Sequence, residues 1–368
     1  MIKTAIILGV TGQDGSHLAE LLLEKKYKVI GVKRRSSTNT LCRLDKVVVN
    51  PDFSIVEGDV IDPSSINYLV NSYQPDELFN LSAQSHVHTS FQQPAYTFQV
   101  NTVGVLNILE AVRNYSPQTK VYQASTSELW GSNYTIAQDG SSNKYQDEDT
   151  HFAPNSPYAI AKLASHHLVR LYRDAYNLFA CSGILHNHCG PRRGEEFVTR
   201  KITKWIGQFK YWKDNHPNAY FIFDKIGNDI YISGRTQTNV GLEFPKLRLG
   251  NIDAVRDWSH AKDMVRGMWM MLQQEKPKDY VLCSGIGHSV REFLDISFSY
   301  IGIKDWSEYV VIDPCLYRPC EVEFLQGKYN LAKKELGWEP EISFKELVKE
   351  MVDYDIKIST IVVDKKIV

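Results

Sequence analysis

The chain has 368 residues, of which 43% are hydrophobic and 23% are charged. This length and composition are typical of a soluble globular protein with one large domain or two. The formal net charge of -1 argues against nucleic acid or an anionic membrane as a general partner, and no apolar run approaches the length of a membrane span.

The cysteine and histidine patterns indicate no metal site. The six cysteines include no Cys-x-x-Cys pair, as expected for free thiols in a reducing compartment. His86 and His88, like His186 and His188, would share one face of a strand, but no clustered carboxylates accompany them to complete a metal site. We therefore expect structural or cofactor-contacting histidines. Since a signal-peptide cleavage region is also missing, we expect a cytoplasmic protein.

The first predicted elements form a strand–helix–strand unit. Residues 4–9 are an apolar run typical of a buried parallel strand, residues 16–26 have helical periodicity, and residues 28–32 form a second apolar strand. A Gly-x-x-Gly-x-x-Gly motif begins at Gly9, where the backbone must approach a pyrophosphate at a helix N-terminus. This unit predicts a dinucleotide-binding domain, and the alternative is a purely structural turn.

The residues after the second strand indicate which nicotinamide cofactor is bound. An Asp or Glu there would accept hydrogen bonds from the adenosine ribose and repel a 2′-phosphate. The chain instead reads Lys33-Arg34-Arg35-Ser36-Ser37, and cations with hydroxyls suit a phosphate dianion. We therefore predict NADP rather than NAD, the alternative being a solvated basic loop.

Strands and helices continue to alternate as far as residue 185. Further strands are predicted at residues 54–57, 77–81, 120–124 and 179–185, and helices at residues 64–73, 96–115 and 158–172. This alternation predicts an α/β fold with a doubly wound parallel sheet, the Rossmann arrangement. Asp59 is available to the adenine, and the small residues after the fourth strand leave room for a dinucleotide backbone.

Polar residues follow the fifth strand. The chain reads Ser125-Thr126-Ser127-Glu128 at this point, and ligands of doubly wound sheets collect at the carboxyl ends of the strands. On the residues alone, Glu128 is as readily a strand-end cap or a salt-bridge partner as a catalytic group. Its position after Thr126 favours catalysis.

Tyr158 and Lys162 lie one helical turn apart in the next predicted helix. Ser156 is a favourable N-cap and Pro157 fits the first turn. An ammonium held beside a phenol stabilises the phenolate and lowers the pKa of the tyrosine, which can then transfer protons near neutral pH. Tyr-x-x-x-Lys alone is a weak motif because many surface helices carry it by chance, so its context after the 125–128 strand end decides the interpretation.

Beyond residue 190 the strict alternation lapses, which predicts a second, smaller lobe. We expect residues 1–190 to form the dinucleotide-binding domain, with residues of about 250–290 returning to it, and residues 191–368 to form mainly an α/β substrate-binding lobe. The predicted helices here span residues 197–210, 263–275, 290–301, 329–336 and 344–356, with a strand and loop at 246–257.

Several stretches together resemble a known family. The glycine motif at Gly9, the pair Ser125-Thr126 and Tyr158-x-x-x-Lys162 resemble the extended short-chain dehydrogenase/reductase superfamily. More narrowly, the chain resembles the GDP-mannose 4,6-dehydratases in residues 9–16, 34–37, 125–131, 191–201, 250–258 and 317–322.

This resemblance implies conversion of GDP-D-mannose to GDP-4-keto-6-deoxy-D-mannose and water, the first step toward GDP-L-fucose or GDP-D-rhamnose. Tyr158, aided by Lys162 and Thr126, would take the proton of the sugar 4-hydroxyl while hydride passes from C4 to NADP. Glu128 would then remove the C5 proton that the new ketone acidifies. Water would leave from C6, and the hydride would return there.

The resemblance also implies ligand contacts. Cofactor-contacting positions are matched by Gly9, Thr11, Gly12, Gln13, Asp14, Arg34, Arg35, Ser36, Ser37, Asp59, Val60, Leu81, Ala83, Gln84, Ser85, Tyr96, Lys162, His188 and Arg193. Nucleotide-sugar positions are matched by Ser85, Ser127, Glu128, Tyr158, Asn187, Val198, Lys201, Arg256, Arg318 and Glu321. The three cations in this second set, Lys201, Arg256 and Arg318, are suited to binding a diphosphate.

The loop of residues 34–43 resembles one that reaches a neighbouring subunit's cofactor in family tetramers, so we expect a homotetramer or at least a dimer. Two departures from the family stand out. Cys189-Gly190 replaces the usual Glu-Ser, and residues 208–244 form an insertion rich in aromatic residues, among them Tyr211 and Trp212. We interpret the insertion as a cover for the substrate lobe, a subunit contact or a tolerated surface loop.

Three alternatives remain open. Another nucleotide-sugar 4,6-dehydratase or a 4-epimerase of the same fold is the nearest, although an epimerase would lack the carboxylate at position 128. An added 4-reductase activity with external NADPH is the second. The third is a non-catalytic NADP-binding sensor, which would be expected to lose Tyr158, Lys162 or Glu128.

Overall fold

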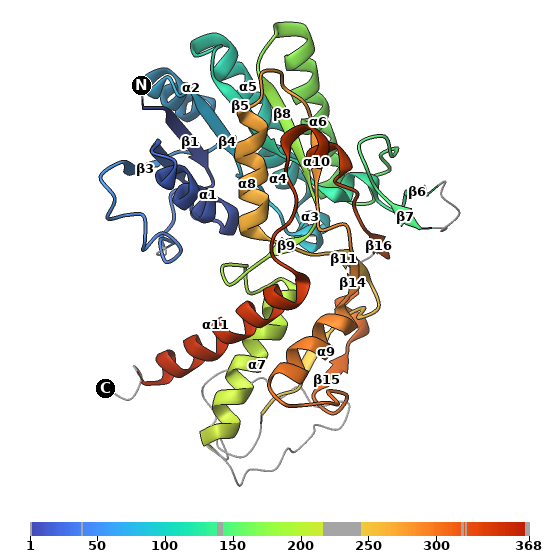
Figure 1. Cartoon of the computed structure of the whole chain (residues 1–368). Coiled ribbons are helices and arrows are strands. Elements are labelled where there is room, and N and C mark those ends of the chain that lie inside the picture. The colour runs from blue at the N-terminus through green and yellow to red at the C-terminus, as the bar shows by residue number, and fades with distance from the viewer. Residues whose placement is uncertain are drawn as a thin grey trace. The chain divides into compact units, whose positions relative to one another are not determined.

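The computed structural model describes residues 2–37, 40–137, 143–215, 244–317, 320 and 322–364. The chain divides into two compact units (Figure 1). The first unit comprises Met1–Arg192, Val255–Gly287 and Cys320–Ser343, and the second comprises Arg193–Ala254, His288–Pro319 and Phe344–Val368. Residues 191–368 were predicted to form mainly the second lobe, and of these Val255–Gly287 and Cys320–Ser343 cluster with the first unit.

A seven-stranded sheet forms the centre of the first unit (Figure 1). Its order is β13-β8-β5-β4-β1-β2-β3, and neighbouring strands pair in parallel. The strands are β1 Thr4–Leu8, β2 Lys28–Lys33, β3 Phe53–Glu57, β4 Glu77–Asn80, β5 Lys120–Ala124, β8 Ala180–Leu185 and β13 Tyr280–Leu282. The strand order reverses between β1 and β4, which is where doubly wound sheets bind ligands.

Helices cover both faces of this sheet. The helical segments of the first unit are α1 Gln13–Glu24, α2 Pro63–Tyr73, α3 Val87–Gln92, α4 Pro94–Phe98, the π-helical segment η1 Gln99–Val103, α5 Gly104–Tyr115, α6 Pro157–Tyr176, α8 Ala261–Leu272 and α10 Asn330–Leu336. The predicted doubly wound α/β fold is therefore confirmed. The seventh strand, β13, was not predicted, because its three residues are too few to show a periodicity.

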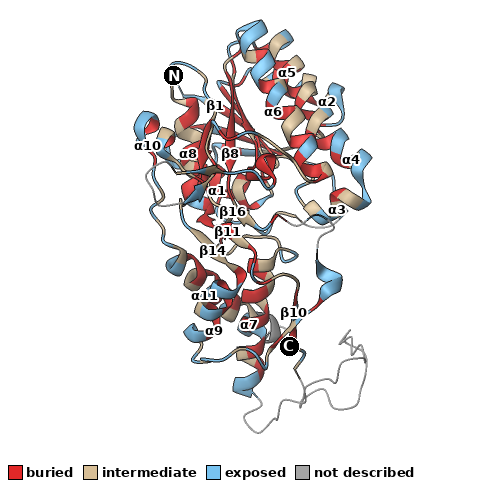
Figure 2. Ribbon diagram, turned by 90° about the vertical axis from the view of Figure 1, so that its right-hand side faces the viewer, coloured by how far each residue is buried: buried red, intermediate tan, exposed pale blue. Residues whose placement is uncertain are grey.

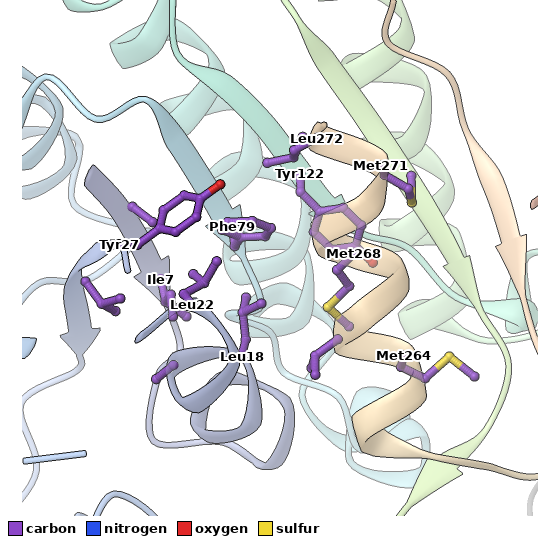
Figure 3. Close-up of a cluster of buried hydrophobic side chains, with 14 of the residues drawn as sticks. Ile7, Leu18, Leu22, Tyr27, Phe79, Tyr122, Met264, Met268, Met271 and Leu272 are labelled. Atoms are coloured by element: carbon purple, nitrogen blue, oxygen red, sulfur yellow. The ribbon is translucent and has the colours of Figure 1, made fainter. Parts of the chain in front are cut away.

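Because both faces are covered, inner strands such as β4 and β8 are buried along their whole length, whereas the edge strand β3 is only partly buried. Ala5 and Ile7 of β1 belong to the core beneath α1 and α8, while Ile6 and Leu8 belong to the core beneath α2, α5 and α6. Figure 2 shows the strands of the central sheet as mostly buried and the outer helix surfaces as exposed. Figure 3 shows the first of these cores, where Leu18 of α1 and the methionines of α8 meet the sheet.

One local prediction in the first unit was confirmed and one was wrong. The helix predicted over residues 96–115 is present and begins at Pro94, because proline favours a first helical turn, and the π-helical turn η1 lies between α4 and α5 within it. His86 and His88 do not lie on a strand. His86 is instead the N-cap of α3, where its Nδ1 accepts a hydrogen bond from the Thr89 N–H at 3.3 Å.

Short elements complete the first unit. The 3₁₀ turn η2 Ser127–Trp130 follows β5, and β6 Thr135–Ile136 pairs in antiparallel with β7 Lys144–Tyr145. Two further parallel pairs join β9 His188–Cys189 to β12 Ser259–His260, and β11 Val255–Asp257 to β16 Phe324–Leu325. β14 Gly287–Ser289 spans the boundary between the units.

The second unit is mainly helical. It contains α7 Val198–Asn215, β10 Leu247–Leu249, α9 Val290–Tyr300, β15 Val310–Ile312, the 3₁₀ turn η3 Pro314–Leu316 and α11 Phe344–Asp364. Helix α7 packs against α9 and α11, and β10 pairs with β15 in parallel. The buried carboxylate of Asp355 on α11 holds α7, because it accepts hydrogen bonds from the Arg200 guanidinium and the Thr203 hydroxyl.

Helix α7 extends five residues beyond its predicted end, into the proposed insertion. Trp205, Phe209 and Trp212 stack in sequence along it, and Phe244 packs against all three rings. Trp212 is therefore part of the core of the second unit. The rest of the predicted insertion, residues 216–243, lies outside the described residues.

Among the described residues, no helix is both long enough and apolar enough to cross a membrane. The same residues contain no group of three or more His, Cys, Asp or Glu side chains arranged to hold a metal ion.

Candidate active site

The glycine loop, residues 9–15, runs from β1 into the start of α1 and has no side chain at its three glycines. Gly9 has a φ of +83°, and a Cβ on Gly15 would lie 2.4 Å from the Gly9 carbonyl oxygen. The N-cap of α1 is Gly12, and no side chain caps the helix there. The first N–H groups of α1 are therefore not capped by a side chain, and they lie at the switch point of the sheet. This arrangement fits the pyrophosphate of a dinucleotide.

Asp14 and His188, two predicted cofactor contacts, are joined in the first unit. The Nε2 atom of His188 lies 2.9 Å from a carboxylate oxygen of Asp14, and its Nδ1 atom lies 2.8 Å from the His186 carbonyl oxygen. Gln13 donates to both Asp14 and the His188 carbonyl. These bonds fix the imidazole ring beside the glycine loop.

Arg43 and Arg192, which were not predicted as site residues, hold the same loop. Arg43 donates to the Thr11 carbonyl at 3.3 Å and to the Arg192 carbonyl at 2.8 Å. The Arg192 guanidinium in turn binds Ser16 and Glu20 of α1. Their sequence signal was weak, because single arginines distant in the chain show no spacing that would connect them with the loop.

The basic segment after β2 is partly engaged within the chain. Lys33 forms a 2.9 Å ion pair with Glu57, and Arg34 donates a hydrogen bond to the Tyr96 hydroxyl. The structure thus brings together Arg34 and Tyr96, which were both predicted to contact the cofactor. Arg35, Ser36 and Ser37 continue the exposed segment.

The residues after β3 and β4 mostly organise turns. Asp59 accepts a hydrogen bond from the Ile61 N–H at 3.2 Å, and the side chain of Gln84 bonds both Thr97 and the His86 N–H. Buried Asn101 pairs with both backbone polar groups of Gln84. Val60, Leu81, Ala83 and Ser85 lie in the same stretches, at the carboxyl ends of the strands.

Thr126 and Glu128 lie in the turn that follows β5. Thr126 is the N-cap of η2, and its hydroxyl accepts a hydrogen bond from the Glu128 N–H at 3.3 Å. Thr126, Ser127 and Glu128 are all buried. Trp130 at the end of the turn donates to the Thr150 carbonyl and stacks on His186, so the turn is anchored on its inner side.

Lys162 meets the end of β5 from α6. As predicted, Ser156 caps this helix, since its hydroxyl accepts from the Ala159 N–H at 3.1 Å. The Lys162 ammonium, 3% exposed, donates to the carbonyl of Ala124, the last residue of β5, at 2.8 Å. Burial lowers the pKa of Lys162 to about 8. Tyr158, one turn earlier, is also buried.

The predicted nucleotide-sugar residues are divided between the units. Asn187 and Arg256 lie in the first unit, where the Ser259 N–H donates to the Asn187 carbonyl at 2.9 Å. Val198 and Lys201 lie on α7 of the second unit, and burial lowers the pKa of Lys201. Arg318 and Glu321 lie outside the described residues.

Arg193, a predicted cofactor contact, belongs to the second unit, where its guanidinium lies 3.7 Å from the centre of the Phe197 ring. The unusual Cys189-Gly190 pair belongs to the first unit. Cys189 is buried in β9, and a Cβ on Gly190 would contact His260 at 3.4 Å.

Comparison with known proteins points to one family. The family model for GDP-mannose 4,6 dehydratase matches residues 6–220 and 230–351. GDP-mannose 4,6 dehydratase 2 of Arabidopsis thaliana is 44% identical over 367 residues, which cover 97% of this chain and 88% of the relative.

Two solved structures share the fold at lower identity. The dTDP-glucose 4,6-dehydratase of Bacillus anthracis in complex with NAD aligns with a TM-score of 0.74 and 19% identity, over 96% of this chain and 97% of that one. RMD from Pseudomonas aeruginosa complexed with NADPH aligns with a TM-score of 0.71 and 20% identity, over 97% of this chain and 99% of that one. At such identity the likeness supports the fold alone. The cofactor is NAD in the first of these structures and NADPH in the second.

Proposed function

Because the chain belongs to the GDP-mannose 4,6-dehydratase family, we propose that it converts GDP-D-mannose to GDP-4-keto-6-deoxy-D-mannose and water. The observation that carries the proposal is the hydrogen bond from the Lys162 ammonium to the Ala124 carbonyl at 2.8 Å. It joins the Tyr158 helix to the strand whose next turn bears Thr126 and Glu128. A phenol, an ammonium, a hydroxyl and a carboxylate thus come from adjoining elements.

Each of these groups has a distinct task. Tyr158 acts as a phenolate, which the Lys162 ammonium stabilises through its charge, and takes the proton of the sugar 4-hydroxyl. Thr126 orients the same hydroxyl. Glu128 takes the C5 proton, which a ketone at C4 makes acidic, and this proton leaves with the C6 hydroxyl as water. The proton that Tyr158 took from the 4-hydroxyl balances the one that C5 regains when hydride reaches C6. A simple 4-epimerase needs no base at C5, and the buried carboxylate of Glu128 therefore favours a dehydratase.

The cofactor proposed for this site is NADP, which when bound accepts hydride from C4 and returns it to C6. The glycine loop and the uncapped start of α1 fit its pyrophosphate. Arg34, Arg35, Ser36 and Ser37 would hold a 2′-phosphate, since no carboxylate occurs among residues 33–37. In a titration of both cofactors, Arg34→Ala should weaken NADP about tenfold while NAD changes little. Equal losses for both would instead favour NAD as the natural cofactor.

Incubation with GDP-mannose and catalytic NADP tests the proposed reaction. The expected product is lighter than the substrate by one water, with no NADPH accumulating by absorbance. Stoichiometric NADPH would mean a simple dehydrogenase. An unchanged mass with a new sugar isomer would mean an epimerase.

Three other interpretations are tested by extending this incubation to other nucleotide sugars and to added NADPH. Turnover of a different nucleotide sugar, but not of GDP-mannose, would keep the reaction and change the substrate. NADP binding without turnover of any nucleotide sugar would favour the non-catalytic sensor. A further loss of the 4-keto group with added NADPH would reveal an additional 4-reductase activity.

We also propose that the chain self-associates through residues 34–43. The proposal rests on the family resemblance of this loop, whose Arg43 additionally ties the glycine loop of its own chain. Light scattering after size-exclusion chromatography should give a tetramer or a dimer, and a monomer at micromolar concentration would contradict this assignment.

A further inference from the structure

Asp257 is a fully buried carboxylate that the proposed reaction does not use. It is 0% exposed and accepts four hydrogen bonds. One oxygen accepts from the Ser284 N–H at 2.7 Å and from the Ser284 hydroxyl at 2.6 Å. The other accepts from the Gly285 N–H at 2.9 Å and from the Gly327 N–H at 3.1 Å. We call these four residues the Asp257 clamp.

The donors of the clamp come from separate segments of the first unit. Asp257 is the last residue of β11, Ser284 and Gly285 follow β13 of the main sheet, and Gly327 follows β16. A carboxylate offers about four lone-pair sites, and all four are filled here, so Asp257 has no free position for proton transfer with a sugar. Its effect is to tie one end of β11 to the sheet.

Two glycines make the clamp possible. Gly285 has a φ of +80°, which favours glycine. A Cβ on Gly327 would lie 2.6 Å from both the Cys283 sulfur and the Nε2 atom of His186. Backbone N–H groups that converge in this way form an anion-binding nest, and the anion that fills it is the chain's own carboxylate.

The strand that the clamp holds carries Arg256. Successive side chains of a strand point to opposite faces, so the clamp grips one face of β11 while Arg256 projects from the other. Beyond Trp258 the chain continues into β12, which pairs with β9, and the Ser259 N–H donates to the Asn187 carbonyl. The clamp therefore fixes the strand that bears Arg256. Ser259, two residues after Asp257, then holds Asn187 through its N–H.

We infer that Asp257 is a positioning residue for the substrate: its carboxylate, held by Ser284, Gly285 and Gly327, keeps Arg256 and Asn187 in place for the diphosphate of a nucleotide sugar. This inference rests on the proposed function. Arg256 would bind the phosphates through its charge, while Asp257 would act through the backbone and touch no substrate atom. Replacing one carboxylate oxygen by an NH₂ group, as in Asp257→Asn, leaves at least one buried N–H group without an acceptor, and this loosens β11.

The test compares Asp257→Asn with Asp263→Asn in the intact protein. Asp263 is a matched control, because it is also a buried carboxylate of the first unit that accepts a backbone N–H, from Ile342 at 3.1 Å. GDP and NADP affinities are measured for both variants by calorimetry, well below their melting temperatures. Asp257→Asn should weaken GDP binding about tenfold and leave NADP binding within about twofold. Asp263→Asn should lower the melting temperature and leave both affinities unchanged.

Three outcomes would overturn the inference. GDP affinity that survives Asp257→Asn makes Asp257 merely structural, as does an equal loss of GDP and NADP binding. A parent protein that binds NADP but no GDP overturns both this inference and the proposed function.

A second variant covers the case in which Asp257→Asn fails to fold. Ser284→Ala removes one hydroxyl donor and keeps the three N–H donors of the clamp, so it should weaken GDP binding by about two- to threefold with NADP unaffected. Unchanged GDP affinity in this variant would count against the clamp.

Discussion

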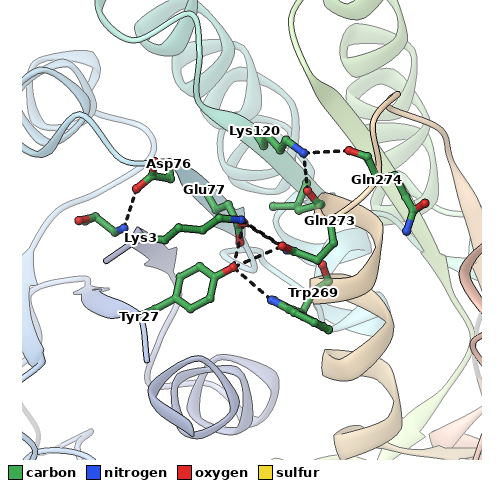
Figure 4. A network of polar contacts seen from close by, with 10 residues as sticks. Lys3, Tyr27, Asp76, Glu77, Lys120, Trp269, Gln273 and Gln274 are labelled. Carbon is green, nitrogen blue, oxygen red and sulfur yellow. Dashed lines mark hydrogen bonds and ion pairs between the residues drawn. The ribbon is translucent and has the colours of Figure 1, made fainter. Parts of the chain in front are cut away.

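The two ends of the parallel sheet bury charge in opposite ways. At the amino end, Glu77 begins β4 with 1% exposure and accepts hydrogen bonds from Lys3 at 2.9 Å, Tyr27 at 3.0 Å and Gln273 at 3.1 Å (Figure 4). At the carboxyl end, the hydrogen bond of the buried Lys162 ammonium within the described part of the chain goes to a neutral carbonyl, that of Ala124.

The pKa values follow from this difference. Burial opposes the charge of Lys3, but the hydrogen bond and attraction to Glu77 outweigh it and raise the pKa of Lys3. Lys162 has no such compensation, and its pKa falls to about 8. Removing one partner of a buried ion pair leaves an uncompensated charge and destabilises the fold, whereas a buried charge that already lacks a counter-ion has a shifted pKa and is suited to chemistry. Substitutions at the amino end should therefore affect stability, and substitutions at the carboxyl end should affect activity.

Lys162→Met should give the largest effect. Without the ammonium, Tyr158 lacks the charge that stabilises its phenolate, and kcat should fall about 10³-fold or more. The melting temperature should not fall, because an uncompensated buried charge has been removed. Turnover and thermal unfolding are measured on the same preparation. A large loss of stability would break the comparison between the two ends of the sheet.

Glu128→Gln should reduce overall turnover by about 10²- to 10⁴-fold, because the base for the C5 proton is lost. The amide keeps the shape of the side chain, so folding and NADP binding should be retained. Rapid mixing with GDP-mannose and monitoring at the NADPH absorbance should reveal oxidation at C4 without dehydration. Normal turnover in this variant would remove Glu128 from the mechanism.

The stability of Lys162→Met relative to the parent should depend on pH. Below pH 8 the lysine is protonated in the folded and unfolded chains alike, so its burial penalty is constant. The difference between 10.5 and about 8 corresponds to a margin of at most about 3 kcal/mol in favour of the variant. Between pH 8 and 10.5 the folded parent releases the proton first, its stability rises, and the margin should shrink. Urea unfolding at pH 7 and pH 9.5 measures this difference in the free energy of unfolding. A difference that grows with pH would contradict the lowered pKa of Lys162.

Glu77→Gln should give the smallest effect on activity. The amide loses the charge that attracts Lys3, and we expect the free energy of unfolding to fall by about 2 kcal/mol. Because Glu77 lies at the opposite end of the sheet from Lys162, kcat of the folded enzyme should change less than about twofold. Urea unfolding and turnover are compared, and a kcat loss comparable with that of Lys162→Met would show that the two ends are not separate.

The sequence predicted most of the central sheet and the start of helix α6, because these follow local rules. Continuous apolar runs gave six of the seven strands, and the cap at Ser156 fixed the start of α6. By contrast, β13 was too short for a pattern, and the return of residues 320–343 to the first unit depends on pairing between distant segments. The Asp257 clamp and the Arg43 contact were missed for the same reason, since their partners lie far apart in the chain.

Following a deuterium label from C4 of the substrate tests most directly the central claim, that hydride moves from C4 to C6 within one turnover. GDP-mannose carrying deuterium at C4 is incubated with the protein and catalytic NADP, and the product is examined by mass spectrometry and NMR. A dehydratase cycle at the carboxyl end of the sheet predicts loss of one water with the deuterium retained at C6. Deuterium that stays at C4, or that accumulates in the reduced cofactor, would contradict the account.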